Sequence, residues 1–124
     1  MTAPPRGVSA RWAVAAGALL AAVAVAAGAF GAHGLEGRLE PRAIDQWETA
    51  FRYLMYAALG TVASGLCGAR LAGSLLIAGG LIFAGSVGAI ALGAPSILGA
   101  VAPVGGLSMI LGFVALAWAG WRSA

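Results

Sequence analysis

Residues 71–121 read LAGSLLIAGGLIFAGSVGAIALGAPSILGAVAPVGGLSMILGFVALAWAGW, a run of 51 residues without a single charged side chain. A helix rises about 1.5 Å per residue, so one helix of this length would be more than twice as long as the ~30 Å hydrocarbon core of a bilayer. The run must therefore fold back on itself. Residues 93–96 (GAPS) are the natural break because Gly and Pro interrupt helices. The run predicts a third membrane span over about 71–93 and a fourth over about 99–121.

The start of the fourth span has two readings. Pro103 suits the first helical position, where its missing N–H costs nothing. In the other reading the helix begins near Ile97, with Ser96 as its cap, and Pro103 kinks it. The sequence leaves both readings open.

Two apolar segments come before this run and supply two further spans, over about 12–32 and about 51–69. The first is too long for the core of a secretory signal peptide, which has about 7–15 apolar residues. The whole chain is 61% hydrophobic and 9% charged, whereas a soluble domain carries about 25% charged residues. Residues 1–124 are therefore expected to form one all-α domain, an integral membrane four-helix bundle.

The positive charge comes from seven arginines, with no lysine, and gives a net charge of +3. These arginines are single and dispersed, which argues against a nucleic-acid interface, because such interfaces cluster basic residues. Four spans divide them into two groups, one on each side of the membrane. Arg6, Arg11, Arg70 and Arg122 fall on the side of the termini, and Arg38, Arg42 and Arg52 fall on the other. The positive-inside rule then predicts that both termini are cytoplasmic.

Nearly all of the polar chemistry lies between His33 and Arg52, where all four carboxylates and the only histidine are found. Pro41 suits the first position of a second helix. From there an apolar stripe recurs at helical spacing, at Ile44, Trp47, Phe51, Leu54 and Met55. Glu48 precedes Arg52 by four residues, which favours a surface ion pair. This pattern predicts an amphipathic start to the second helix that runs along the membrane interface before it enters the bilayer.

The candidate functional cluster is His33, Glu36, Arg52 and Tyr56, which we expect at the mouth of the bundle. Ionisable groups near membrane depth are costly and are often functional. The competing reading is a solvated interfacial helix with ordinary ion pairs. His33 and Glu36 supply at most two metal ligands, too few for a zinc site, so no metal and no cofactor are expected. The serines are scattered through the spans without a nucleophile-plus-base pattern, so we do not expect an enzyme.

Small residues dominate the spans, and the chain has 20 glycines. Helices associate in lipid through close packing, which small residues permit. Internal packing is favoured over a dimer interface as the role of these residues, and it leaves little room for a wide pore. The positions expected to pack or break helices are Gly28, Gly31, Gly34, Gly85, Pro103, Gly105 and Gly106.

Three segments carry a family resemblance: GAFGAHGL at residues 28–35, FAGS at 83–86 and APVGGL at 102–107. Together they resemble the small bacterial inner-membrane proteins known as domain of unknown function 423, whose eukaryotic relatives include transmembrane protein 256. The resemblance covers nearly the whole chain. It implies a four-span inner-membrane protein with cytoplasmic termini and brings no established activity. The family often has a histidine where this chain has Tyr56, which puts a two-histidine mechanism in doubt here.

Two functions follow from these patterns. The first is a non-enzymatic structural or accessory membrane component, which has the lipid bilayer as its surroundings and a membrane-protein partner or a second copy as its candidate partners. The second is a small transporter or an ion- or proton-conducting protein with His33, Glu36 and Arg52 as a polar gate at the turn between the first and second helices. For this second function, Pro103 would mark a break in the fourth helix that exposes backbone groups to the substrate.

Overall fold

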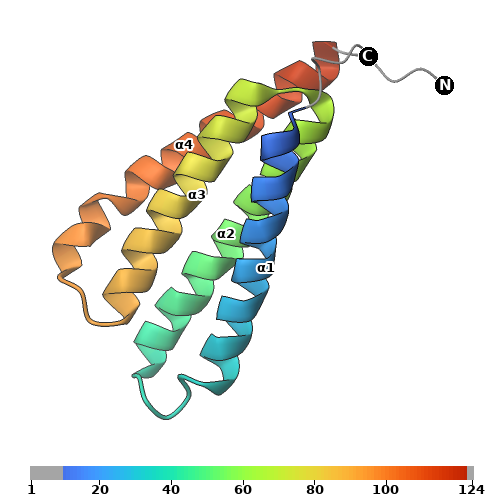
Figure 1. The fold of residues 1–124 in the computed structure, drawn as a ribbon. Helices are drawn as coiled ribbons and strands as arrows, with labels where there is room; N and C mark the ends of the chain where they lie inside the picture. The colour runs from blue at the N-terminus through green and yellow to red at the C-terminus, as the bar shows by residue number, and fades with distance from the viewer. Residues whose placement is uncertain (1–9, 123–124) are drawn as a thin grey trace.

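The computed structural model describes residues 10–122 and is all-helical there (Figure 1). Its elements are α1 (Arg11–His33), α2 (Pro41–Cys67), α3 (Arg70–Ala91), the short 3-10 helix η2 (Ser96–Ala100) and α4 (Ala102–Arg122). The four long helices run alternately up and down, so the segments that connect them lie at two opposite ends of the bundle (Figure 1). Arg6, which the orientation prediction includes, lies outside the described residues.

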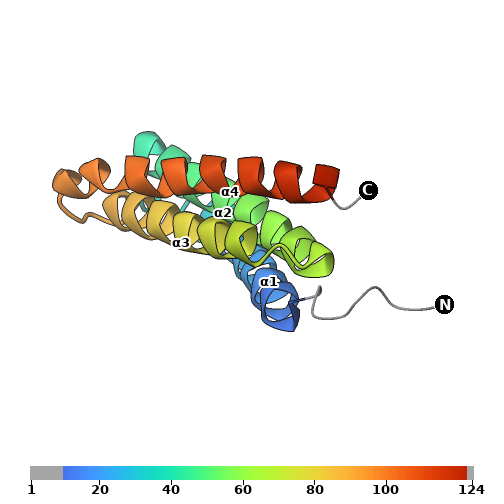
Figure 2. The ribbon, with the colours of Figure 1, turned by 90° about the horizontal axis from the view of Figure 1, so that it is seen from above.

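The helices pack in the order of the chain. α1 lies along α2, α2 along α3, and α3 along α4, whereas α2 and α4 touch at only a few positions. Viewed from above, α4 and α1 lie on opposite sides of α3 (Figure 2). The few contacts between α2 and α4 leave the bundle less closed along the side between these two helices.

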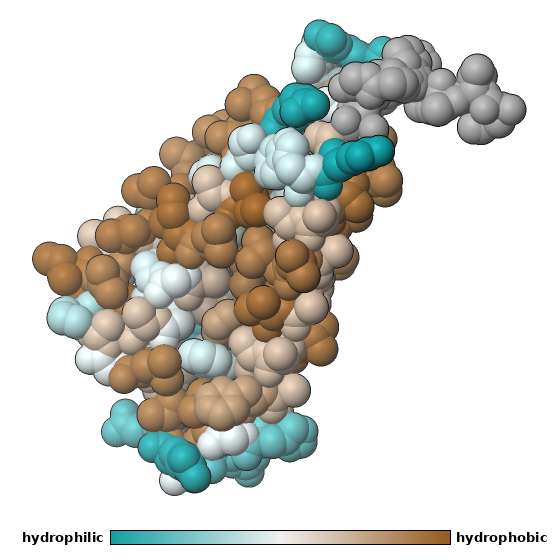
Figure 3. All heavy atoms as spheres, viewed as in Figure 1, coloured by the Kyte–Doolittle hydropathy of each residue, from teal (hydrophilic) through white to brown (hydrophobic). Residues whose placement is uncertain are grey.

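Hydrophobic side chains form a broad band between two hydrophilic ends (Figure 3). Within residues 10–122, three segments are long and apolar enough to cross a membrane: Arg11–His33, Arg70–Ala91 and Ser96–Arg122. The first half of α2 carries the charged side chains of the polar segment, and α2 lies between α1 and α3. The all-α membrane bundle expected from composition is confirmed, and a fourth crossing by α2 stays a prediction.

The helix ends follow local backbone chemistry. α2 begins at Pro41, as the sequence predicts. α3 ends at Ala91, two residues before the expected end of the third span, and Gly93 then adopts a φ of +108° that favours glycine. η2 occupies residues 96–100, and α4 begins at Ala102 with Pro103 in its first turn. Pro103 therefore lies in the first turn of α4, where its missing N–H removes no helical hydrogen bond. The other reading, a helix that begins near Ile97 and is kinked at Pro103, is not what the structure shows.

Glycines bring the backbones of α3 and α4 into contact. A Cβ placed on Gly79 would lie 2.6 Å from the Gly105 carbonyl oxygen, and a Cβ on Gly105 would lie 2.6 Å from the Phe83 nitrogen. Ser108 Oγ adds a 2.8 Å hydrogen bond to the Leu75 carbonyl oxygen. Such contacts give van der Waals attraction that lipid cannot replace, so these residues hold α4 against α3.

Small side chains cover the buried face of α2. Thr61 and Ser64 are fully buried, and their hydroxyls donate to the carbonyl oxygens of Ala57 and Gly60, at 2.7 and 2.8 Å. Each hydroxyl is thereby satisfied within its own helix, as low-dielectric surroundings require. Leu76 is the largest fully buried side chain of the described residues, so the centre of the bundle is packed tightly.

Candidate functional site

The four residues of the predicted polar cluster are all exposed. His33 ends α1, Glu36 follows in the turn, and Arg52 and Tyr56 lie one helical turn apart on α2. His33, Glu36 and Arg52 make no hydrogen bond or ion pair with the described part of the chain, so the expected pair between Glu48 and Arg52 does not form. Glu36 and Tyr56 line different hollows, and His33 and Arg52 line neither of them.

The polar end has a shallow hollow of about 330 Å³ between the end of α1 and the start of α2. Gly31, Ala32, Glu36, Pro41, Ile44, Asp45 and Glu48 line it. Three carboxylates border this hollow, yet no group of three His, Cys, Asp or Glu within residues 10–122 is placed to hold a metal ion. The hollow is therefore an acidic surface at the end of the bundle where α1 ends and α2 begins.

Trp47 connects α2 to α1 beside that hollow. Its Nε1–H donates a 2.7 Å hydrogen bond to the carbonyl oxygen of Ala27. Its ring contacts Phe30 edge-on at 6.1 Å and lies 4.6 Å from Phe51 at a tilt of 50°. A Cβ on Gly31 would collide with the same indole, 2.8 Å from Nε1. The half-buried amphipathic ring thus finds both an apolar surface and a polar partner.

The glycines that end α1 divide into two kinds. Gly31 leaves the space that Trp47 fills, and Gly34 lets the Phe30 ring lie against the turn, since a Cβ there would approach Phe30 Cδ1 to 2.7 Å. Gly34 and Leu35 both donate to the Phe30 carbonyl oxygen and so close the helix. Gly28 has open space where a Cβ would point. Segment 28–35 therefore first leaves space at Gly31 for the Trp47 ring, which we call the Trp47 socket, and then ends α1 at Gly34 and Leu35.

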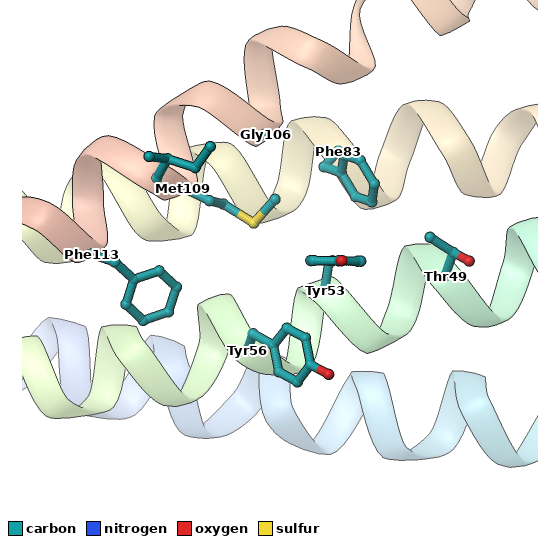
Figure 4. Close-up of a pocket in the computed structure, with 8 residues that line it drawn as sticks. Thr49, Tyr53, Tyr56, Phe83, Gly106, Met109 and Phe113 are labelled. Atoms are coloured by element: carbon teal, nitrogen blue, oxygen red, sulfur yellow. The ribbon is translucent and has the colours of Figure 1, made fainter.

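A larger apolar groove of about 450 Å³ opens where α2 and α4 diverge (Figure 4). We call it the α2–α4 groove. It is lined by Thr49, Tyr53, Tyr56, Phe83, Gly106, Met109, Ile110 and Phe113. Tyr53 contacts Tyr56 edge-on at 5.3 Å and Phe83 at 5.4 Å, so three rings from α2 and α3 form one aromatic wall.

The two adjacent glycines of α4 face different surroundings. Gly105 is buried against α3, whereas a Cβ on Gly106 would meet no atom within 4 Å and would point toward the α2–α4 groove. Gly85 on α3 is open in the same way. One glycine of the pair holds α4 in place, and the next leaves the groove wide.

Sequence reasoning missed the roles of two sets of residues. The sequence predicts Trp47 only as one member of the apolar stripe of the second helix, yet its indole donates a hydrogen bond to α1 and packs against Phe51. The groove was missed because its residues come from three helices. Thr49, Tyr53 and Tyr56 do recur at helical spacing, and this polar-aromatic stripe was the available signal.

Comparison with known proteins identifies the family. The family model described as "Protein of unknown function (DUF423)" matches residues 27–106. A UPF0382 membrane protein of Staphylococcus epidermidis is 43% identical over 106 residues, which cover 81% of this chain and 87% of that protein. UPF0382 membrane protein YwdK of Bacillus subtilis is 38% identical over 106 residues, covering 79% and 86%.

No solved structure matches the chain. The matched range contains both the Trp47 socket and the Gly105–Gly106 pair. The names of the relatives describe bacterial membrane proteins and give no catalytic function. On this evidence the chain belongs to the DUF423 family of membrane proteins.

Proposed function

We propose that this protein is a non-enzymatic accessory component of the bacterial inner membrane that binds a transmembrane helix of another membrane protein in the α2–α4 groove. The observation that carries the proposal is the groove itself, an aromatic-walled hollow on an otherwise tightly packed bundle. Open Gly106 permits close approach of a partner backbone, which is how helices associate in lipid.

Polar groups in the groove favour a protein over a lipid chain as its occupant. Thr49, Tyr53 and Tyr56 line the groove, and none of their three hydroxyls makes a hydrogen bond within residues 10–122. An acyl chain offers these hydroxyls no acceptor, whereas a partner helix carries polar side chains and carbonyl groups. An unsatisfied polar group in hydrocarbon is costly, so the three hydroxyls support a peptide partner.

The closed interior supports an accessory role over conduction. Backbone contacts at Gly79 and Gly105 close the space between α3 and α4, and fully buried Leu76 lies at the centre. Both hollows described above have exposed residues in their lining, so they open on the surface of the bundle. A path for ions through a single chain would require α3 and α4 to move apart at Gly79 and Gly105.

Photo-crosslinking at two adjacent positions of α4 tests the proposal. Ile110 lines the groove, and Leu111 is exposed but does not line it. We expect p-benzoylphenylalanine at Ile110, in native membranes, to give one protein adduct that mass spectrometry identifies, and the same group at Leu111 to give none. Gly106→Leu should abolish the adduct by filling the groove.

Four outcomes would contradict this proposal. Equal labelling from Ile110 and Leu111, or lipid adducts alone, would remove the groove as a protein site. An adduct of two copies of the 12.2 kDa chain would replace the partner by a homo-oligomer. Persistence of the adduct in Gly106→Leu would place the contact elsewhere.

Transport stays the alternative, and the carboxylate-lined hollow near Glu36 is the observation in its favour. Carboxylates at the membrane interface can attract cations. Proteoliposomes that show a proton flux above the protein-free level, lost in His33→Ala, would favour transport over the accessory role. Flux at the protein-free level would leave the hollow without a transport function.

A further inference from the structure

We propose that the end of the bundle where α3 begins and α4 ends holds a binding site for an anionic phospholipid. The phosphate of this lipid would lie between Arg70 and Arg122. A hollow of about 240 Å³ lies there, between the start of α3 and the end of α4. Both arginines line it, together with Leu71, Ala72, Ala115 and Trp118. This inference is independent of the α2–α4 groove, which has other lining residues.

Two guanidinium groups from different helices converge on this hollow. Arg70 is the first residue of α3 and Arg122 the last residue of α4. The Arg122 guanidinium carbon lies 5.8 Å from the centre of the Trp118 ring, a cation–π contact that orients it. Neither arginine forms an ion pair within the described part of the chain. Both therefore keep N–H groups available for an acceptor, and guanidinium forks match phosphate geometry.

Among the described residues, no carboxylate compensates the positive charge at this end. α1 begins here with Arg11, α3 with Arg70, and α4 ends here with Arg122. All four carboxylates lie at the other end, in the turn after α1 and in the first half of α2: Glu36, Glu40, Asp45 and Glu48. In the described residues this end is therefore purely positive, and its electrostatic complement is an anion.

The surroundings of the arginines select a lipid over a free anion. Arg70 and Arg122 stand at the ends of apolar helices, which is the depth of the phospholipid headgroups. Leu71 is 68% exposed and Trp118 is 60% exposed beside them, so an acyl chain can continue from the phosphate along apolar surface. Small Ala72 and Ala115 leave the hollow open between the two helices. Basic pockets between transmembrane helices recognise anionic headgroups in this way.

Lipid selectivity measured by electron spin resonance tests the site. The full-length protein is placed in phosphatidylcholine vesicles with a trace of spin-labelled phosphatidylglycerol or spin-labelled phosphatidylcholine, and the immobilised fraction gives the relative association constant. We expect a preference for phosphatidylglycerol. Each of the two arginines that line the hollow should contribute about five-fold at low salt through its contact with the phosphate, so Arg70→Gln and Arg122→Gln should each weaken the preference by about that factor.

Arg11→Gln is the matched control, because it removes one positive charge at the same end without touching the hollow. We expect this variant to keep most of the preference. An equal loss in Arg11→Gln would show a diffuse surface charge instead of a site and would overturn the proposal.

Two further measurements do not depend on the folding of any variant. A wild-type protein with no preference for phosphatidylglycerol over phosphatidylcholine would refute the site directly. Inorganic phosphate at millimolar concentration, with ionic strength held constant by chloride, should not displace the spin-labelled lipid. Displacement would assign the arginines to a soluble anion and would overturn the lipid assignment.

Discussion

Alanine substitutions at Gly105 and Gly106 should have opposite consequences, although the two positions are adjacent. At Gly105 a new Cβ would lie 2.6 Å from the Phe83 nitrogen and 2.7 Å from the Gly79 carbonyl oxygen. Both atoms belong to the backbone of α3, so no side-chain rotation relieves the clash. At Gly106 a new Cβ would meet nothing within 4 Å.

The size of the effect follows from the displacement. Ordinary van der Waals contact begins at 3.4 Å, so α4 must move about 0.8 Å away from α3 at Gly105. A gap of 0.5–1 Å already forfeits a quarter to a half of the attraction between facing atoms. Overpacking of this kind costs about 1–3 kcal/mol, and the hydrogen bond from Ser108 to Leu75 is lengthened as well. Gly106→Ala should be neutral or stabilise, because Ala exceeds Gly in helix propensity by about 1 kcal/mol.

Reversible unfolding in mixed detergent micelles, followed by helical circular dichroism, measures both variants against the wild type. We expect Gly105→Ala to lower the free energy of unfolding by about 1–3 kcal/mol and Gly106→Ala to leave it unchanged or raised. Equal destabilisation by the two substitutions would refute this reasoning, and so would a neutral Gly105→Ala.

Three other predictions concern the contacts between helices and the orientation. Trp47→Phe removes the indole hydrogen bond to α1 and should lower the free energy of unfolding by about 0.5–1.5 kcal/mol, whereas Trp121→Phe, at a residue 79% exposed, should leave it unchanged. Ser108→Ala removes a hydrogen bond between helices and should cost about 0.6 kcal/mol in the same assay; a cost above 2 kcal/mol would contradict this figure. Alkaline phosphatase fused after Ala124 should be inactive and green fluorescent protein fused there should fluoresce, and the reverse result would invert the predicted orientation.

The outlines of the fold could be read from the sequence because charge and helix-breaking residues mark them. The uncharged run over 71–121 requires a reversal, and Gly93 provides it with a positive φ. Pro41 begins α2 as expected, since its fixed φ suits the first helical position. The start of α4 stayed open because both readings of Pro103 satisfy the same local rules, and only packing on α3 decides between them.

The candidate site was less accessible to sequence reasoning. The pattern placed His33 and Arg52 in one cluster because they lie in one polar segment, yet the structure leaves them exposed without shared contacts. The groove depends on the angle between α2 and α4, which no local pattern specifies. Arg70 and Arg122 had been interpreted as topology markers, and their convergence requires the pairing of α3 with α4.

The packing of each helix on its predecessor also bears on how the chain is made. Because α1 meets α2, α2 meets α3, and α3 meets α4, the main contacts join segments that are neighbours in the sequence. Each newly synthesised helix can thus dock on the helix made just before it, and no helix waits for a distant partner. Chains with such local contacts fold quickly. It follows that assembly can proceed during synthesis, one hairpin at a time, with α4 the last to join.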